Sequence, residues 1–151
     1  MTTMITKNRM NYLTKSAKQT IALGKKIATT LRGGEVFGLS GDLGAGKTTL
    51  VKGIALGLGV KKPITSPTFV LMKVYRVTNR PIKKLVHIDC YRLKGSGELT
   101  AIGAPEYFGQ KDTVVLIEWP EKIKNILPKK ILNVKLKLGK KNNQRKINFN
   151  V

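Results

Sequence analysis

One stretch decides the fold that this sequence predicts: Gly41-Asp42-Leu43-Gly44-Ala45-Gly46-Lys47-Thr48 matches the pattern G-x-x-x-x-G-K-[ST] at every fixed position. Glycines let backbone N–H groups curl around phosphate oxygens, lysine neutralises the β- and γ-phosphates, and the threonine hydroxyl can ligate Mg²⁺. The helix that follows offers its positive N-terminus. The stretch therefore predicts a nucleotide site whose phosphates are surrounded by Gly41, Gly44, Ala45, Gly46, Lys47 and Thr48.

The segments on either side of this stretch agree with that interpretation. Residues 36–40 form a short apolar run typical of a strand, and residues 47–58 carry apolar side chains at helical spacing, as do residues 16–31. Residues 113–118 contain four consecutive apolar side chains, which is typical of a strand covered on both faces. Together these elements predict an α/β protein.

Further strands are expected to extend this sheet. Residues 69–77 and 84–89 are predicted strands on either side of a turn. Near the C-terminus, residues 131–138 and 146–151 alternate apolar and polar side chains, which predicts an antiparallel hairpin with one lysine-rich, solvated face. We expect a single domain over residues 1–151, with two basic appendages: an N-terminal tail at 1–15 and the C-terminal hairpin at 129–151.

The charge of the chain is unusual, with 29 Lys and Arg against 8 Asp and Glu and a net charge of +21. Such an excess indicates affinity for nucleic acid or another polyanion. The basic residues, however, are 23 lysines and only 6 arginines, and arginine is the residue favoured for bidentate phosphate or guanine contacts. Two interpretations stay open: a surface that faces RNA, and a coding sequence that has drifted toward A and T.

Composition also excludes several classes of protein. An apolar fraction of 41% is enough for a packed core. The longest run without a charged residue is ten residues, 63–72, and contains a proline, so no segment is expected to span a membrane. A single cysteine, Cys90, excludes an internal disulfide and a thiolate metal cluster. It fits a reducing compartment, so we expect a cytoplasmic protein with an inert Cys90 thiol.

Two acidic residues stand at the ends of predicted strands, Asp89 and Glu118. In nucleotide hydrolases such a carboxylate holds Mg²⁺, directly or through water, or orients the attacking water. The alternative is a carboxylate that only caps a neighbouring turn. No Asn/Thr-Lys-x-Asp motif for guanine follows the glycine-rich stretch, so ATP is the expected nucleotide. Trp119 is either a packing anchor or part of the nucleotide site, and His87 alone is typical of a hydrogen-bonded structural residue.

Four motifs occur together and in order: residues 41–49, Ser-Pro-Thr-Phe at 66–69, His-Ile-Asp-Cys-Tyr-Arg at 87–92 and Glu-Trp-Pro-Glu at 118–121. This set closely resembles the bacterial TsaE (YjeE) family, the ATPase required to form threonylcarbamoyladenosine on tRNA. The similarity runs from about residue 16 to residue 128.

The resemblance implies the P-loop NTPase fold, in which helices flank a mixed, largely parallel central sheet. It also implies that Gly44–Thr49 would form the phosphate cradle, and it gives a role to each matching residue. Thr48 and Glu118 would be the Mg²⁺ ligands, Trp119 and Glu121 would lie beside the nucleotide, and Asp89 would be central to a switch-like element. With Lys47, Asp89 and Glu118 would form the catalytic set. The switch-like segments would contain Ser66, Pro67, Thr68, Phe69, His87, Tyr91 and Arg92.

In that family the transfer of the threonylcarbamoyl group belongs to the partner proteins TsaD and TsaB, and ATP hydrolysis resets their complex. The resemblance therefore implies an ATP-binding and ATP-hydrolysing accessory protein, with ATP and Mg²⁺ as cofactors, weak activity alone and possible proximity to tRNA. Two alternatives are a small-molecule kinase and a non-enzymatic RNA-binding module. The kinase is disfavoured because only three arginines, Arg76, Arg80 and Arg92, follow the glycine-rich stretch before the last strands.

The predicted C-terminal hairpin lies outside the segment that carries the motifs. We therefore expect that its basic residues attract RNA in a salt-dependent way and take no part in ATP hydrolysis. Neutralising four of them together should spare hydrolysis: Lys140, Lys141, Arg145 and Lys146.

Overall fold

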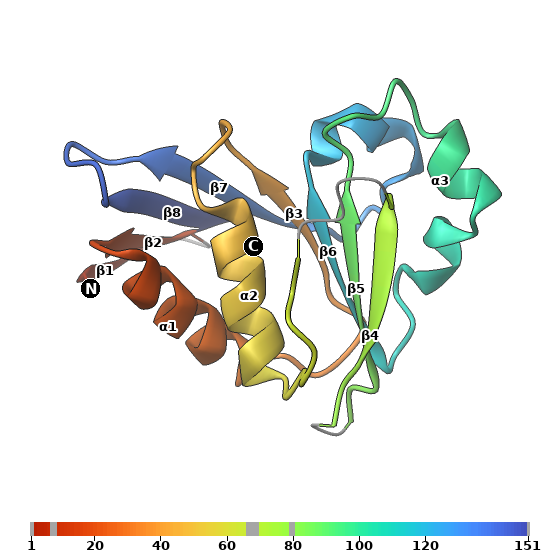
Figure 1. The fold of residues 1–151 in the computed structure, drawn as a ribbon, viewed down its shortest axis with the longest axis horizontal. Helices are drawn as coiled ribbons and strands as arrows, with labels where there is room; N and C mark the ends of the chain where they lie inside the picture. Colours follow the sequence, from red (N-terminus) through yellow and green to blue (C-terminus); the bar gives the residue numbers. More distant parts are fainter. Residues whose placement is uncertain (1, 7–8, 66–69, 79–80, 151) are drawn as a thin grey trace.

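The computed structural model describes residues 2–6, 9–65, 70–78 and 81–150, in which a single eight-stranded sheet forms the centre (Figure 1). Its strand order is β1-β2-β8-β7-β3-β6-β5-β4. The strands are β1 Thr2–Thr6, β2 Arg9–Thr14, β3 Val36–Ser40, β4 Met72–Arg76, β5 Lys84–Asp89, β6 Thr113–Glu118, β7 Leu132–Leu138 and β8 Arg145–Asn150. The helices are α1 Ala17–Ala28, α2 Lys47–Gly57, α3 Gly97–Ala101 and the 3₁₀ segments η1 Ala104–Tyr107 and η2 Pro120–Ile126.

The sheet is mixed, as the sequence predicts, with a parallel centre and antiparallel additions on both sides. The prediction that it is largely parallel is wrong, because three pairings of the described strands are parallel and four are antiparallel. The strands β7, β3, β6 and β5 run parallel, while β4 on one side and β8, β2 and β1 on the other are antiparallel to their neighbours. The register places Leu39 of β3 and Asp89 of β5 beside Glu118 of β6. The carboxyl ends of three adjacent strands therefore meet, and ligands of open α/β sheets bind at that edge.

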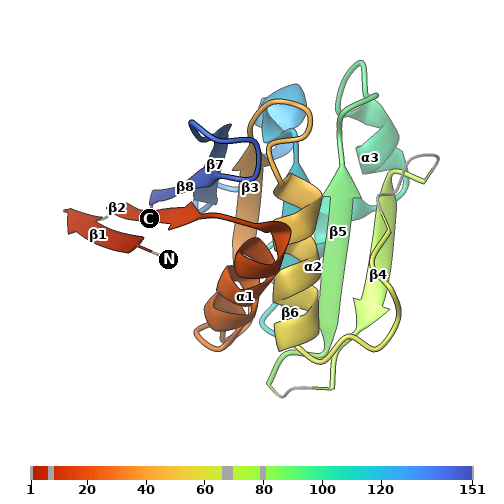
Figure 2. The same cartoon turned by 60° about the vertical axis from the view of Figure 1, so that its left-hand side comes forward.

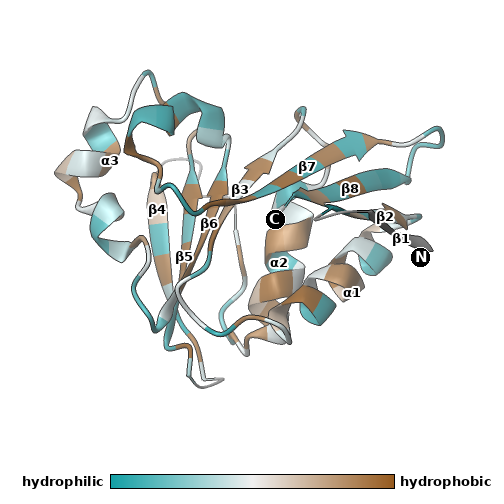
Figure 3. Ribbon diagram, turned by 180° about the vertical axis from the view of Figure 1, so that it is seen from behind, coloured by the Kyte–Doolittle hydropathy of each residue, from teal (hydrophilic) through white to brown (hydrophobic). Residues whose placement is uncertain are grey.

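Helices cover both faces of the central strands, so these strands are buried on both sides. The helices α1 and α2 pack on one face and α3 with η1 and η2 on the other (Figure 2). All six residues of β6 are buried, which confirms the prediction made from its run of apolar side chains. Figure 3 shows apolar colour along β3 and β6, whereas β8 is largely hydrophilic.

The two helices on the first face approach closely because small residues stand at their crossing. A Cβ added at Gly53 of α2 would lie 2.4 Å from the carbonyl oxygen of Ile21 in α1, and one added at Gly24 would meet the backbone of Gly53 at 2.7 Å. The α1 helix begins as predicted at Ser16, whose side chain accepts a hydrogen bond from the Gln19 N–H at 3.1 Å. The close crossing fixes α2, and with it the start of the glycine-rich loop, against the rest of the fold.

The expected N-terminal tail is wrong, because this segment forms β1 and β2. In β2, Met10 and Tyr12 pack against the main core, and the ring of Tyr12 lies edge-on to Phe149 with 5.7 Å between ring centroids. The strand pairs with β8 over six residue pairs. An unpaired β8 would expose a row of backbone N–H and C=O groups, so the N-terminal strands complete the sheet edge.

The C-terminal hairpin is confirmed as β7 and β8. Val134 and Leu136 are buried, while Lys135 and Lys137, which alternate with them along the strand, are exposed, as the alternation predicts. The strand predicted at 69–77 is shorter, at Met72–Arg76, and the motif at 66–69 lies outside the described residues. Within the described part of the chain, no helix has the length and apolar character needed to cross a membrane.

Candidate functional site

The glycine-rich loop connects the end of β3 to the start of α2, as the motif requires. Gly41 has φ of 148°, and a Cβ there would lie 2.3 Å from the carbonyl oxygen of Leu136, so no larger residue fits. Gly46 caps α2 with φ of 101°, in the left-handed region that side chains rarely adopt. The loop thus presents its backbone at the N-terminus of an 11-residue helix, where backbone N–H groups and the helix dipole favour anions.

A buried polar cluster lies at the edge of this loop. The Thr48 hydroxyl donates to the Glu118 carboxylate, with Oγ1 2.9 Å from Oε1 and 3.1 Å from Oε2. Nε2 of His87 lies 2.6 Å from Oε2 of the same carboxylate. An ionised carboxylate only accepts hydrogen bonds, so this histidine nitrogen is the donor. Glu118 is 2% exposed and His87 is fully buried, so the three side chains hold each other in one arrangement.

The Lys47 ammonium is enclosed by the same structure. It donates to the carbonyl oxygens of Gly41 and Asp42, the second at 2.9 Å, and lies 4.2 Å from the centroid of the Trp119 ring. Burial lowers the pKa of Lys47 from its usual value, while the nearby carboxylates, Glu118 first, act in the opposite direction. Trp119 itself has φ of 60°, an uncommon backbone for a bulky side chain. That turn directs the indole over the lysine.

The end of β5 brings the second predicted acid to the site. Asp89 accepts a hydrogen bond from the backbone N–H of Tyr91 at 3.0 Å. The ring of Tyr91 is tilted against the ring of Trp119, with 5.1 Å between centroids. Cys90, which lies between Asp89 and Tyr91 in the sequence, is fully buried in the apolar cluster between the sheet and α3, η1 and η2. Burial raises the pKa of the Cys90 thiol to about 12, in agreement with the expected inert thiol.

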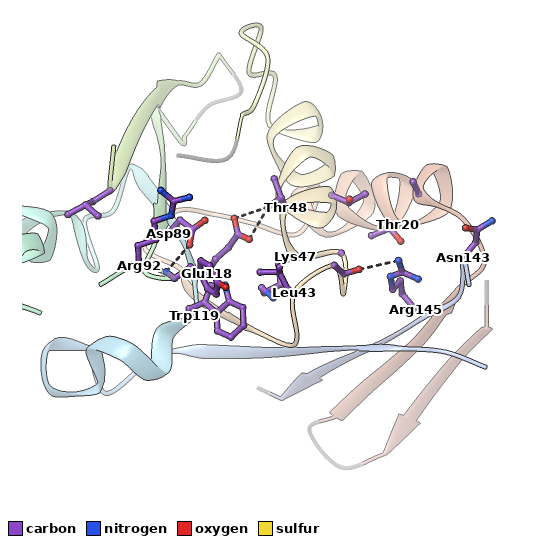
Figure 4. A pocket seen from close by; sticks show the side chains of 16 residues that line it. Thr20, Leu43, Lys47, Thr48, Asp89, Arg92, Glu118, Trp119, Asn143 and Arg145 are labelled. Carbon is purple, nitrogen blue, oxygen red and sulfur yellow. Dashed lines mark hydrogen bonds between the residues drawn. The ribbon is translucent and has the colours of Figure 1, made fainter. Parts of the chain in front are cut away.

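These groups line one cavity of about 400 Å³ (Figure 4). Ten residues predicted for the site contribute to its wall: Gly44, Gly46, Lys47, Thr48, Thr49, Asp89, Tyr91, Arg92, Glu118 and Trp119. Gly41, Ala45, His87 and Glu121 are not among the lining residues. Of these, His87 contacts Glu118 from behind, and Gly41 and Ala45 shape the loop. The predicted segment 66–69 lies outside the described residues.

The cavity also has a wall that sequence reasoning missed. Its residues come from the start of α1, from the turn between β7 and β8 and from the first position of β8: Ala17, Thr20, Asn143 and Arg145, with Leu43 of the loop and Leu71 before β4. Leu43 stands at a variable position of the glycine-rich stretch, and the others belong to no recognisable motif. The C-terminal hairpin is expected to lie apart from the site. This expectation is wrong, because Asn143 and Arg145 line the cavity. The parallel pairing of β7 with β3 places the end of β7 next to the loop. Because β8 pairs antiparallel with β7, the start of β8 lies there too.

The donor set suits a magnesium ion that is bound together with a nucleotide. Within the described ranges, no group of three or more His, Cys, Asp and Glu side chains forms a metal cage. Magnesium in nucleotide sites takes one or two protein ligands, with phosphate oxygens and waters filling the remaining positions. A threonine hydroxyl in contact with a buried carboxylate supplies such a pair of oxygen ligands.

Comparison with known proteins connects this geometry to a family. A family model described as "Threonylcarbamoyl adenosine biosynthesis protein TsaE" matches residues 14–147. The chain belongs to the TsaE family. The match extends past residue 128, where the resemblance in the motifs ends, and takes in both strands of the C-terminal hairpin up to the middle of β8.

Individual TsaE proteins resemble the chain over most of its length. The tRNA threonylcarbamoyladenosine biosynthesis protein TsaE of Bacillus subtilis is 37% identical over 141 residues, covering 93% of this chain and 85% of the relative. The protein of the same name from Treponema pallidum is 40% identical, covering 85% and 92%. The crystal structure of the Bacillus protein YdiB superposes with a TM-score of 0.73 and covers 93% of this chain and 84% of that chain.

Proposed function

We propose that this TsaE family member has the P-loop NTPase fold and binds and hydrolyses Mg·ATP in the cavity at the glycine-rich loop. One observation carries the proposal: the first-turn threonine of α2 and the acid that ends β6 are in direct contact, 70 residues apart in sequence. If the glycine motif matched by chance, a contact between the Thr48 hydroxyl and the buried Glu118 carboxylate would not be expected. The pair lies at the carboxyl edge of the sheet, beside the lysine and the loop.

Each side chain has a distinct task in this proposal. The amides of the loop and the Lys47 ammonium hold the β- and γ-phosphates and stabilise charge on the transferring phosphoryl group. Thr48 and Glu118 are the magnesium ligands, and His87 holds the Glu118 carboxylate in place. Bound Mg²⁺ would neutralise phosphate charge. Asp89 orients the attacking water or couples the nucleotide to the neighbouring switch-like segment.

The biological setting follows from the family. We propose that hydrolysis serves the formation of threonylcarbamoyladenosine on tRNA, in which this chain acts as an accessory to the TsaD and TsaB proteins. Its own hydrolysis is then slow, and the partners set the rate. The family match over residues 14–147 supports this placement.

A ligand-induced thermal shift tests the nucleotide site. Binding to the native state alone adds RT ln(1 + [L]/Kd), or about 2.7 kcal/mol at a hundredfold excess of ligand over Kd. For a chain of this size that corresponds to a rise of about 5–10 °C in Tm. Lys47→Ala should remove most of this rise with Mg·ADP or Mg·ATP. Lys52→Ala is the matched control, because Lys52 has the same charge in the same helix but is exposed.

Equal nucleotide-induced shifts in wild type and Lys47→Ala would refute the site. The pathway is tested separately by a tRNA-modification assay with the partner proteins, with and without this chain, in ATP or in a non-hydrolysable analogue. We expect repeated turnover only with this chain and hydrolysable ATP. Multiple turnovers that do not require the chain would refute the accessory role.

A further inference from the structure

Charge is distributed very unevenly along the chain. All eight acidic residues lie from Glu35 to Glu121, where 12 basic residues accompany them. The flanking segments, residues 1–34 and 122–151, hold 17 lysines and arginines and no acidic residue. Drift of a gene toward A and T replaces arginine with lysine, but it acts along the whole chain and does not remove aspartate and glutamate. The separation of charge therefore favours a surface that binds a polyanion.

The fold brings the two acid-free segments together. The first forms β1, β2 and α1, the second forms β7 and β8, and these elements make up one side of the molecule (Figure 1). In the sheet, β8 lies between β2 and β7. The apolar side chains of these three strands pack into the core on the face that α1 and α2 cover. Side chains that alternate with them lie on the opposite face of the sheet.

That opposite face carries only basic and neutral side chains in β2, β7 and β8. The strand register aligns four cations with four asparagines on it, and we call these eight residues the basic face: Arg9, Lys135, Lys137, Lys146, Asn11, Asn133, Asn148 and Asn150. All four cations are exposed. Within the described part of the chain, none of the four forms an ion pair with a carboxylate. Their charge is therefore available to a ligand.

Two of these cations also repel each other. Lys137 of β7 lies directly opposite Lys146 of β8, and like charges at opposed positions of an antiparallel pair are destabilising. Lys135 adds a third positive charge on the same face, about 7 Å along the strand from Lys137. A polyanion bound to this face would relieve the repulsion. Binding and the relief of repulsion thus act in the same direction.

We infer that the basic face binds the phosphate backbone of RNA. Protein–protein interfaces are depleted of lysine and centred on aromatic or apolar side chains, whereas nucleic-acid interfaces are polar and strongly positive. The eight residues of the basic face include no aromatic side chain on which a base could stack, so phosphates and sugars are the groups bound. Asparagine amides between the cations supply further N–H donors.

The family indicates which RNA is the partner. TsaE proteins take part in threonylcarbamoyladenosine biosynthesis, a modification of tRNA, so tRNA is the expected ligand. The inference goes beyond the proposed nucleotide site and does not depend on it, because no residue of the basic face lines the cavity.

The experiment measures binding of a fluorescein-labelled tRNA transcript by anisotropy, without nucleotide, over about 50 to 300 mM salt. The test variant replaces the four cations of the basic face with glutamine. The matched control replaces four exposed lysines of the helices that cover the other face with glutamine: Lys18, Lys25, Lys26 and Lys52. Both variants lose the same net charge. A general attraction to the basic protein would be weakened equally in both.

The expected effect follows from counterion release. Each phosphate contact contributes about 0.7–0.9 to the slope of log K against log salt concentration, so loss of four contacts should reduce the slope by about 3. At about 0.1 M salt, tRNA binding should weaken at least about a hundredfold. The control should change the slope by less than about 1. Without RNA, ATP hydrolysis should stay within about twofold of wild type in both variants, since the replaced residues lie outside the cavity.

Several results would overturn the inference. They are an unchanged slope in the basic-face variant, an equal loss in the control, and wild-type binding of poly-glutamate as tight as that of tRNA. Loss of TsaD or TsaB binding with unchanged tRNA affinity would assign the face to a protein partner instead.

The melting temperature shows whether each variant folds. If the basic-face variant does not fold, Lys135→Gln combined with Lys137→Gln decides: the slope should fall by about 1.5, and a wild-type slope would refute the inference. Failure of the proposed nucleotide site is detected separately, as the absence of a thermal shift with Mg·ADP.

Discussion

Replacing Glu118 separates its structural role from its proposed role in metal binding. Glu118→Ala removes the acceptor of the fully buried His87, whose Nε2 lies 2.6 Å from the carboxylate. A buried donor without a partner costs about 1–3 kcal/mol. The Thr48 hydroxyl also loses its acceptor, but it can turn toward the cavity. At about 2–4 °C per kcal/mol for a chain of this size, we expect Tm to fall by about 2–12 °C.

Glu118→Gln should leave the fold nearly unchanged, because the amide oxygen still accepts a hydrogen bond from His87 or Thr48. It should nevertheless abolish most of the increase in ADP affinity that magnesium gives, since a neutral amide oxygen is a weaker ligand for a hard cation than a carboxylate oxygen. We expect the ratio of ADP affinities with and without Mg²⁺ to fall at least about tenfold.

The assay combines melting without ligand with ADP titrations in magnesium and in EDTA. Glu98→Gln, an exposed acid in α3, is the control for loss of one negative charge. The reasoning is refuted if Glu118→Gln keeps the wild-type magnesium dependence. It is refuted also if Glu118→Ala melts at the wild-type temperature.

Three further predictions follow from other parts of the structure. Gly53→Ala should destabilise the fold by at least about 1–3 kcal/mol in chemical denaturation, because the new Cβ would lie 2.4 Å from the Ile21 carbonyl. Gly97→Ala in α3, where a Cβ meets nothing within 4 Å, should be neutral or stabilising. Asp89→Ala should lower kcat more than ADP affinity, and equal losses in both would contradict its assigned task. Neutralising the three exposed lysines Lys135, Lys137 and Lys146 should weaken RNA binding and its salt dependence while sparing ATP hydrolysis. Unchanged RNA binding would contradict this prediction.

The parallel centre of the fold was predictable because its information is local. The strands β3, β5 and β6 have the predicted bounds, since the apolar residues that dominate the interior of each strand match the two-sided burial that the sheet imposes. The glycine motif locates the loop and α2 for the same reason. The contact between Thr48 and Glu118 needed one further step, the general rule that strand ends gather at one edge of a sheet.

The parts that were missed depend on contacts between distant segments. The alternation of Met10 and Tyr12 in β2 is a weak strand signal, and only pairing with β8 gives these residues a core to face. Arg145 carries no motif, because its contact with the loop depends on the path of β7 and β8 through the sheet. The four basic hairpin residues that were expected to act alike therefore differ in position. Arg145 lies at the cavity, whereas Lys140, Lys141 and Lys146 are exposed to solvent.

The indole beside Lys47 gives this protein an intrinsic optical probe. Trp119 is the sole tryptophan of the chain, so ultraviolet excitation at the red edge of protein absorption reports on one ring without a label or a substitution. Its emission depends on the ammonium 4.2 Å away and on the adjacent Tyr91 ring. Any ligand that draws the lysine toward itself changes that environment. Stopped-flow fluorescence of the unmodified protein can thus time the arrival and departure of nucleotide, even in the presence of partners whose tryptophans have been replaced.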